Sequence, residues 1–166
     1  MKIARFKVGN GPAQLGAVAG GDVVSLAALD LGDDVVAAAM LEPAARQAAL
    51  DGAETWALSD VTLLAPVARP PKFLAIGLNY TDHIEEGGRP APEYPMFFNK
   101  QSTCVNDPNA DVPIPAAAPD CVDYEGELGM VIGVECRAVS KADAASVVAG
   151  YTVINDVSVR DWQRRA

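Results

Sequence analysis

Polar and apolar residues alternate most regularly in residues 123–134, and the interpretation of the chain starts from this stretch. Side chains of a strand point to opposite faces in turn, so the alternation predicts one strand whose apolar face packs on the core. The opposite face then carries three carboxylates side by side. They belong to Asp123, Glu125 and Glu127.

Carboxylates this close repel one another, so a fold tolerates them only if water screens them, protons neutralise them or a cation bridges them. Two interpretations follow. The stretch is a solvated edge strand with its acids in water, or it is part of a cation site. Gly126, between the two glutamates, has no side chain and leaves room for a group to approach the backbone.

The first part of the chain predicts a small β-rich domain with short helices. Its alternating runs are separated by glycine-containing turns, and Asp33, Asp34 and Pro43 suit the first turns of two helices. We expect strands at residues 2–8, 14–18, 22–26 and 60–64, and helices at 33–41 and 43–52.

A proline-rich connector at residues 66–71 separates this domain, residues 1–65, from the remainder, residues 72–166. The apolar run at the start of the second part predicts a strand covered on both faces. In all, we expect strands at residues 72–78, 96–100 and 151–154, a helical turn within 79–88, and helices at 140–148 and 157–166, the last capped by Ser158.

Composition excludes several classes of function. The chain has 166 residues, half of them hydrophobic, and a formal charge of −9, which disfavours binding to nucleic acid or to an anionic membrane. The N-terminus lacks the apolar run of a signal peptide, and no run approaches the length of a membrane span. Three cysteines without C-x-x-C spacing are expected to be reduced thiols, so we expect a cytoplasmic protein.

Candidate chemistry comes from three places in the sequence. Glu125 and Glu127, with Asp156 at the end of a later strand, offer carboxylate oxygens, which suit Mg²⁺, Mn²⁺ or Ca²⁺ better than zinc. His83 is the only histidine, and Glu86 follows it at helical spacing. A carboxylate that holds one ring nitrogen leaves the other basic, as activation of water requires.

Four motifs, in this order and spacing, resemble the fumarylacetoacetate hydrolase family across residues 72–166. They are G-L-N-Y-x-D-H-x-x-E at residues 77–86, F-x-K at 98–100, D-Y-E-x-E-L at 123–128 and G-Y-T-x-x-N-D-V-S-x-R-D-x-Q at 150–163. The resemblance implies an α+β fold: a mixed β-roll, preceded here by the small N-terminal domain of many bacterial members.

The resemblance also implies roles for residues. Glu125, Glu127 and Asp156 match the ligands of a divalent metal, Mg²⁺ or Mn²⁺, and His83 and Glu86 match a water-activating dyad on a mobile lid. Gln163 matches a substrate contact. Arg160 matches either a substrate contact or a structural ion pair. For Lys100 we favour a salt bridge beneath the site over substrate binding, and for Asp123 a structural role.

The implied reaction is hydrolysis of a C–C bond in an acylpyruvate or related 2-oxo acid, in which the metal stabilises the enolate that leaves. The same site suits decarboxylation or isomerisation of a small oxo or hydroxy-dienoate acid. An alternative of another class is a non-catalytic domain that binds a cation or forms an oligomer interface. The resemblance further implies a homodimer.

Members of the family continue for many residues beyond the position of Gln163, into the remaining strands of the roll. We therefore expect an incomplete roll here, with an unpaired strand edge and exposed apolar surface. On the same reasoning we expect residues 1–166 alone to be inactive.

Overall fold

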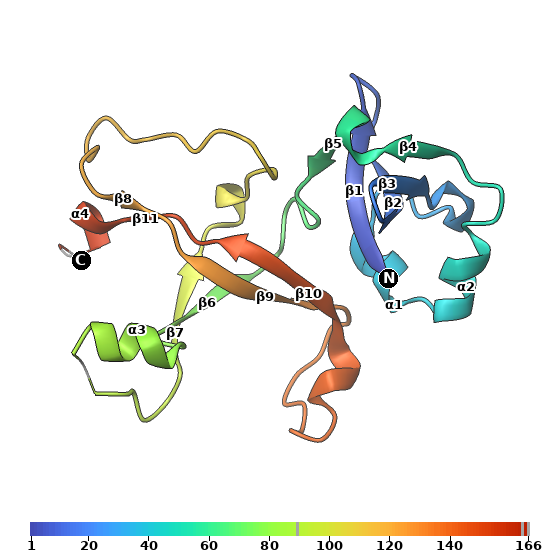
Figure 1. Cartoon of the computed structure of the whole chain (residues 1–166). Helices are drawn as coiled ribbons and strands as arrows, with labels where there is room; N and C mark the ends of the chain where they lie inside the picture. Colours follow the sequence, from blue (N-terminus) through green and yellow to red (C-terminus); the bar gives the residue numbers. More distant parts are fainter. Residues whose placement is uncertain (89, 164, 166) are drawn as a thin grey trace.

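The structure is a computed structural model that describes residues 1–88, 90–163 and 165. The chain is α+β, as the sequence predicted. Figure 1 shows the N-terminal strands and helices gathered into one body, while the rest of the chain forms thin two-stranded ribbons and long loops.

The N-terminal body is built on a five-stranded antiparallel sheet in the order β4-β3-β2-β1-β5. Its strands are β1 (Lys2–Val8), β2 (Gln14–Ala19), β3 (Asp22–Ser25), β4 (Thr55–Ala57) and β5 (Val61–Leu64). Four of these strands were predicted; the sequence missed β4, whose three residues are too few to show a period.

Two short helices complete this body: α1 (Val35–Met40) and α2 (Pro43–Ala48). α2 begins as predicted, with Pro43 in its first turn. α1 begins two residues later than predicted, because Asp34 caps it and its carboxylate accepts a hydrogen bond from the Ala37 N–H (2.9 Å). Turns of 3₁₀ helix lie at Ala27–Leu29 and Leu58–Asp60. The core includes Phe6, Leu15 and Leu26, each at most 1% exposed.

No strand or helix is assigned between β5 and β6 (Phe73–Gly77). The segment is held at its start by the Asp107 carboxylate, which accepts a hydrogen bond from the Ala65 N–H (2.7 Å). The domain boundaries at residues 65 and 72 stay a prediction.

The second part of the chain consists of three two-stranded antiparallel ribbons within the described residues. They pair β6 with β7 (Met96–Lys100), β9 (Gly126–Ile132) with β10 (Val148–Asn155), and β8 (Val122–Asp123) with β11 (Ser158–Val159). Its helices are α3 (Thr81–Glu86) and α4 (Arg160–Gln163), and its 3₁₀ turns are Ser102–Cys104 and Ala144–Val147.

The acidic stretch is two strands, β8 and β9, and the prediction of one continuous strand was wrong. The same antiparallel register continues across the break, since Asp123 pairs with Ser158 and Gly126 pairs with Asn155. The ladder is interrupted because the Glu125 N–H donates to the Asn155 side-chain oxygen (3.1 Å) and not to a backbone carbonyl. The break therefore lies at Glu125 itself.

Two predictions of burial were wrong. Leu74 and Ile76 on β6 are 56% and 39% exposed, so this strand is not covered on both faces. The apolar face of the β9–β10 ribbon does not meet a core either, because its side chains are at least half exposed. Its exposed side chains are Leu128 (65%), Met130 (57%), Ile132 (50%), Tyr151 (63%) and Val153 (85%).

All four predicted helices are shorter than expected: α1 ends at Met40 and α2 at Ala48, and the other two differ more. At residues 140–148 the Ser140 hydroxyl and the Asp143 carboxylate do bond (2.7 Å), but they close a turn before a 3₁₀ segment, and β10 begins at Val148. At the C-terminal end Ser158 lies in β11 and caps no helix, and α4 begins only at Arg160. Ala166 lies outside the described residues.

Candidate metal and substrate site

The three predicted metal ligands lie around the break in the antiparallel pairing. Glu125 lies in the break between β8 and β9, Glu127 lies on β9, and Asp156 directly follows β10. In the continued register Glu125 lies opposite Asp156, and the Asp156 N–H donates to the Glu125 carbonyl oxygen (2.8 Å). Glu127 follows two residues later, where it is paired with Ile154. Residues directly opposite, and residues two apart on one strand, share a face, so the backbone directs the three side chains to one side.

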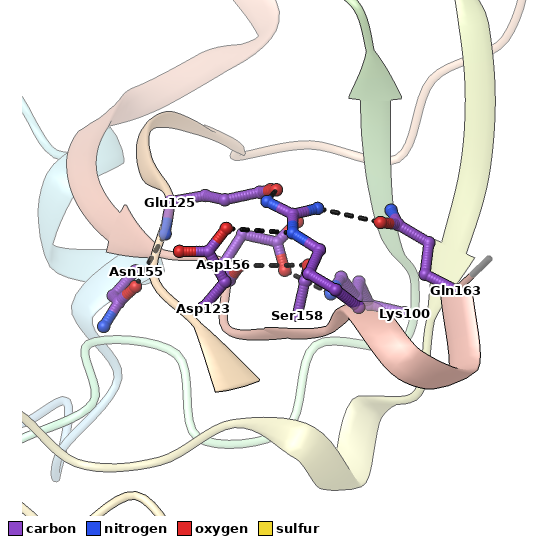
Figure 2. A network of polar contacts seen from close by, with 8 residues as sticks. Lys100, Asp123, Glu125, Asn155, Asp156, Ser158 and Gln163 are labelled. Atoms are coloured by element: carbon purple, nitrogen blue, oxygen red, sulfur yellow. Dashed lines mark hydrogen bonds and ion pairs between the residues drawn. The ribbon is translucent and has the colours of Figure 1, made fainter. Parts of the chain in front are cut away.

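Two cations hold two of these acids (Figure 2). The Lys100 ammonium, at the end of β7, forms an ion pair with the Asp156 carboxylate, which is only 10% exposed. The Arg160 guanidinium forms an ion pair with Glu125 through one terminal nitrogen. The expectation of a salt bridge for Lys100 agrees with this contact.

Arg160 contacts more than one acid. Its Nε donates to the Asp123 carboxylate (2.9 Å), and its other terminal nitrogen donates to the Gln163 side-chain oxygen (2.8 Å). Burial works to lower the pKa of Arg160, but the hydrogen bonds and charges of Asp123 and Glu125 outweigh it, so its pKa is raised. The guanidinium is therefore a permanent positive charge that joins β8, the break and α4.

The residues fit a divalent ion by their chemistry, since carboxylate oxygens from one side of a ribbon are the ligands that Mg²⁺ and Mn²⁺ prefer. In the arrangement of the described residues, however, no three acidic, histidine or cysteine side chains stand close enough together to share one ion. Asp156 and Glu125 are turned toward Lys100 and Arg160. The assignment of Glu125, Glu127 and Asp156 as ligands stays a prediction.

The backbone beside the acids is open, as the sequence suggested. A Cβ placed on Gly126 would meet no atom within 4 Å. Two hollows of about 290 and 440 Å³ lie elsewhere, one around Arg5 and Asp33 and one between β5 and the Asp107 loop. The acids therefore lie outside these hollows, with open backbone beside them at Gly126.

His83 and Glu86 both lie on α3 and both are exposed. Within the described residues the structure joins them by no hydrogen bond or ion pair, so the dyad stays a prediction. The helix follows a sharp turn in which Leu78, a non-glycine residue, has a φ of 53°. Such left-handed backbone is strained for a leucine and sets the direction in which α3 leaves β6.

Sequence reasoning missed the residue that links α3 to the acidic strand. The Tyr80 hydroxyl, immediately before α3, accepts a hydrogen bond from the Leu128 N–H (3.1 Å), next to Glu127 on β9. Tyr80 belongs to the G-L-N-Y motif, so the motif was a signal, but its role required the fold. The contact places the start of the helix that carries His83 beside the acids.

The sequence was compared with known families and structures. A sequence profile described as "Fumarylacetoacetate (FAA) hydrolase C-terminal" matches residues 72–166. The chain belongs to the fumarylacetoacetate hydrolase family. A second profile, described as "Rv2993c-like, N-terminal", matches residues 1–66.

Solved structures agree with this membership. A fumarylacetoacetate hydrolase from Exiguobacterium antarcticum matches with a TM-score of 0.80 and 29% identity, over 99% of this chain and 58% of that one. A maleylpyruvate hydrolase from Sphingobium sp. SYK-6, solved with manganese(II) and pyruvate, matches with a TM-score of 0.77 and 30% identity, over 96% and 60%. The β-roll fold of the family is thus confirmed for this chain.

Curated relatives are enzymes with different reactions. The human mitochondrial oxaloacetate tautomerase is 44% identical over 107 residues, which are 64% of this chain and 34% of that protein. A protein from Burkholderia multivorans is 44% identical over 135 residues, 81% of this chain and 46% of its own length. This fumarylacetoacetate hydrolase family chain thus spans about half or less of the length of these relatives.

None of the helices in the described part of the chain is long and apolar enough to cross a membrane. The cytoplasmic location and the homodimer stay predictions.

Proposed function

We propose that this chain belongs to a divalent-metal-dependent hydrolase that cleaves a C–C bond in an acylpyruvate or related 2-oxo acid. The observation that carries the proposal is the register that sets Glu125 opposite Asp156, with Glu127 on the same face. The manganese(II) and pyruvate of the maleylpyruvate hydrolase structure support both the metal and the substrate class.

In this proposal Glu125, Glu127 and Asp156 hold Mg²⁺ or Mn²⁺. The ion supplies Lewis-acid stabilisation of the negative charge that develops on the oxo acid. Arg160, Gln163 and Lys100 offer the substrate carboxylate a positive charge and hydrogen-bond donors.

The water-activating role falls to α3. His83 takes a proton from water at one ring nitrogen, and Glu86 orients the ring from the next turn of the helix. Both side chains are exposed in the structure, so they are accessible to water and substrate. The Tyr80 hydrogen bond to Leu128 keeps the start of α3 beside the acids.

A second candidate is tautomerisation or isomerisation of an oxo acid at the same site. It is favoured by the 44% identity with the human oxaloacetate tautomerase and by the similarity to an isomerase from Mycobacterium smegmatis, described as a 5-carboxymethyl-2-hydroxymuconate delta-isomerase (TM-score 0.73, 32% identity). This reaction needs the same stabilisation of an enolate-like charge but no attack by water.

The test is a substrate screen with the intact polypeptide, whose length is first measured by mass spectrometry. Acylpyruvates, oxaloacetate and a hydroxy-dienoate are each assayed with Mg²⁺, with Mn²⁺ and after chelation. We expect metal-dependent turnover of one class, and its loss in His83→Ala with metal binding intact. A His83→Ala variant with full activity would contradict the proposal and favour a non-catalytic domain.

A further inference from the structure

The two cations at the acid cluster have a common feature: each contacts an acid that the proposed function assigns to the metal. Lys100 pairs with Asp156, and Arg160 pairs with Glu125. A positive side chain and a metal ion cannot both hold the same carboxylate oxygen without repulsion. The two contacts therefore affect how tightly the site binds a metal, an inference that rests on the proposed function.

We propose that Lys100 and Arg160 are internal counter-ions of the metal site: they neutralise Asp156 and Glu125 when no metal is bound, compete with a divalent ion for these acids, and give them up when the ion binds.

The charge of the cluster is consistent with one divalent ion. Among the described residues, its four carboxylates are compensated by two side-chain cations, which leaves two negative charges. The members are Asp123, Glu125, Glu127, Asp156, Lys100 and Arg160. Glu127 forms no ion pair with a described residue, so it is the acid that an incoming cation meets first.

The two cations differ in the contacts that remain to them after they release Glu125 and Asp156. Arg160 also contacts Asp123 and Gln163, so its guanidinium stays paired when Glu125 turns to a metal. Lys100 has the Phe98 ring 5.8 Å away as its other described contact, and its partner Asp156 is nearly buried. Removing one partner of a buried pair leaves the other charge uncompensated, so Lys100 should matter more for stability than Arg160.

The test measures metal affinity rather than activity. Mn²⁺ is titrated calorimetrically into the intact polypeptide and into its variants Arg160→Gln and Lys100→Met, and the melting temperature of each is measured with EDTA and with saturating Mn²⁺. Counter-ion loss should lower the melting temperature in EDTA and tighten Mn²⁺ binding by about three- to tenfold, because a competing charge is gone. The Mn²⁺-induced rise in melting temperature should grow accordingly.

A matched control separates the effect of losing a salt bridge from the effect of losing a cation that competes with Mn²⁺ for the acids. Arg5 pairs with Asp33 (2.6 Å) in the N-terminal domain, and its side chain is 18% exposed against 19% for Arg160. Arg5→Gln should lower the melting temperature without changing Mn²⁺ affinity. Glu127→Gln should abolish Mn²⁺ binding, because it removes a proposed ligand.

The outcomes distinguish the inference from the proposed function. One result would overturn the counter-ion inference and leave the proposed metal site intact. It is Mn²⁺ binding that depends on Glu127 but is unchanged or weaker in Arg160→Gln and Lys100→Met. If Lys100→Met does not fold, Arg160→Gln decides alone. Absence of Glu127-dependent binding in every variant would overturn both.

Discussion

The two parts of the chain bury their apolar residues very differently. In the N-terminal domain Phe6 and Val23 are fully buried. Among the described residues after residue 72, Ala118 is the one buried hydrophobic residue. Leu128 and Val153 are 65% and 85% exposed. The alternating patterns that predict strands occur in both parts of the chain.

The difference lies in what covers each strand. β1 has a neighbour on each edge, β2 and β5, and α1 contacts it. β9 is paired with β10 alone, and its apolar side chains stay exposed although α1 contacts β10 and a Cβ on Gly133, just beyond β9, would meet the Met40 side chain. A periodic pattern therefore indicates which face of a strand is apolar, but burial depends on a second layer that the pattern does not specify.

The largest expected effect comes from removing a buried aromatic ring. Phe6 is fully buried, with its ring centroid 5.4 Å from that of Trp56. Phe6→Ala should lower the free energy of unfolding by about 3–5 kcal/mol. Urea unfolding followed by Trp56 fluorescence, in a Trp162→Phe background, measures it. Phe97 is 64% exposed, so Phe97→Ala should cost less than about 0.5 kcal/mol; equal losses would contradict the comparison.

A methyl group added to a glycine probes the same contrast. A Cβ on Gly16 would lie 2.4 Å from a Val23 methyl carbon and 2.8 Å from the Phe6 ring, whereas a Cβ on Gly126 would meet nothing within 4 Å. Gly16→Ala should lower the free energy of unfolding by about 1–3 kcal/mol, measured in the same urea titration. Gly126→Ala is the control, and a loss as large there would show that the backbone beside the acids is not open.

Two capping side chains give a smaller contrast. Asp34 accepts a hydrogen bond from the Ala37 N–H at the start of α1, so Asp34→Ala should lower the free energy of unfolding by about 1 kcal/mol. Ser140 bonds Asp143 in a turn that begins no α-helix, so Ser140→Ala should cost less. Thermal unfolding of the two variants checks the order, and the reverse order would be inconsistent with the shorter helix.

The smallest effect is expected on the open face of the β9–β10 ribbon. Val153→Thr replaces a methyl group with a hydroxyl at a side chain that is 85% exposed. The free energy of unfolding should change by less than about 0.5 kcal/mol, as measured by urea titration. A loss above that value would mean that another surface covers this face in solution.

The sequence predicted much of the fold. Capping by Asp34, Pro43 in the first turn of α2 and the alternating strands were readable because they are local. The break at Glu125 was not readable, because it depends on the Asn155 side chain from another strand. The tail from residue 157 was misassigned because pairing of Ser158 with Asp123 overrides its helical pattern.

The candidate site was predictable in its residue types but not in its contacts. The motifs indicated the acids, Lys100, Arg160 and Gln163. The structure pairs Lys100 with Asp156 and links Arg160 to Glu125 and Gln163, whereas Glu127 forms no ion pair with a described residue. Which cation holds which acid depends on the register between β9 and β10 and on the position of β7, and a sequence specifies neither. The link from Tyr80 to Leu128 depends on the same tertiary packing.

The central claim is that Glu125, Glu127 and Asp156 converge on one divalent ion. Electron paramagnetic resonance of Mn²⁺ added to the intact polypeptide, compared with its Glu127→Gln variant, tests it most directly. The account predicts that the free Mn²⁺ signal falls with a saturable stoichiometry of about one ion per chain, as a single open site requires, and that Glu127→Gln abolishes this binding. Equal Mn²⁺ binding by both proteins would contradict it.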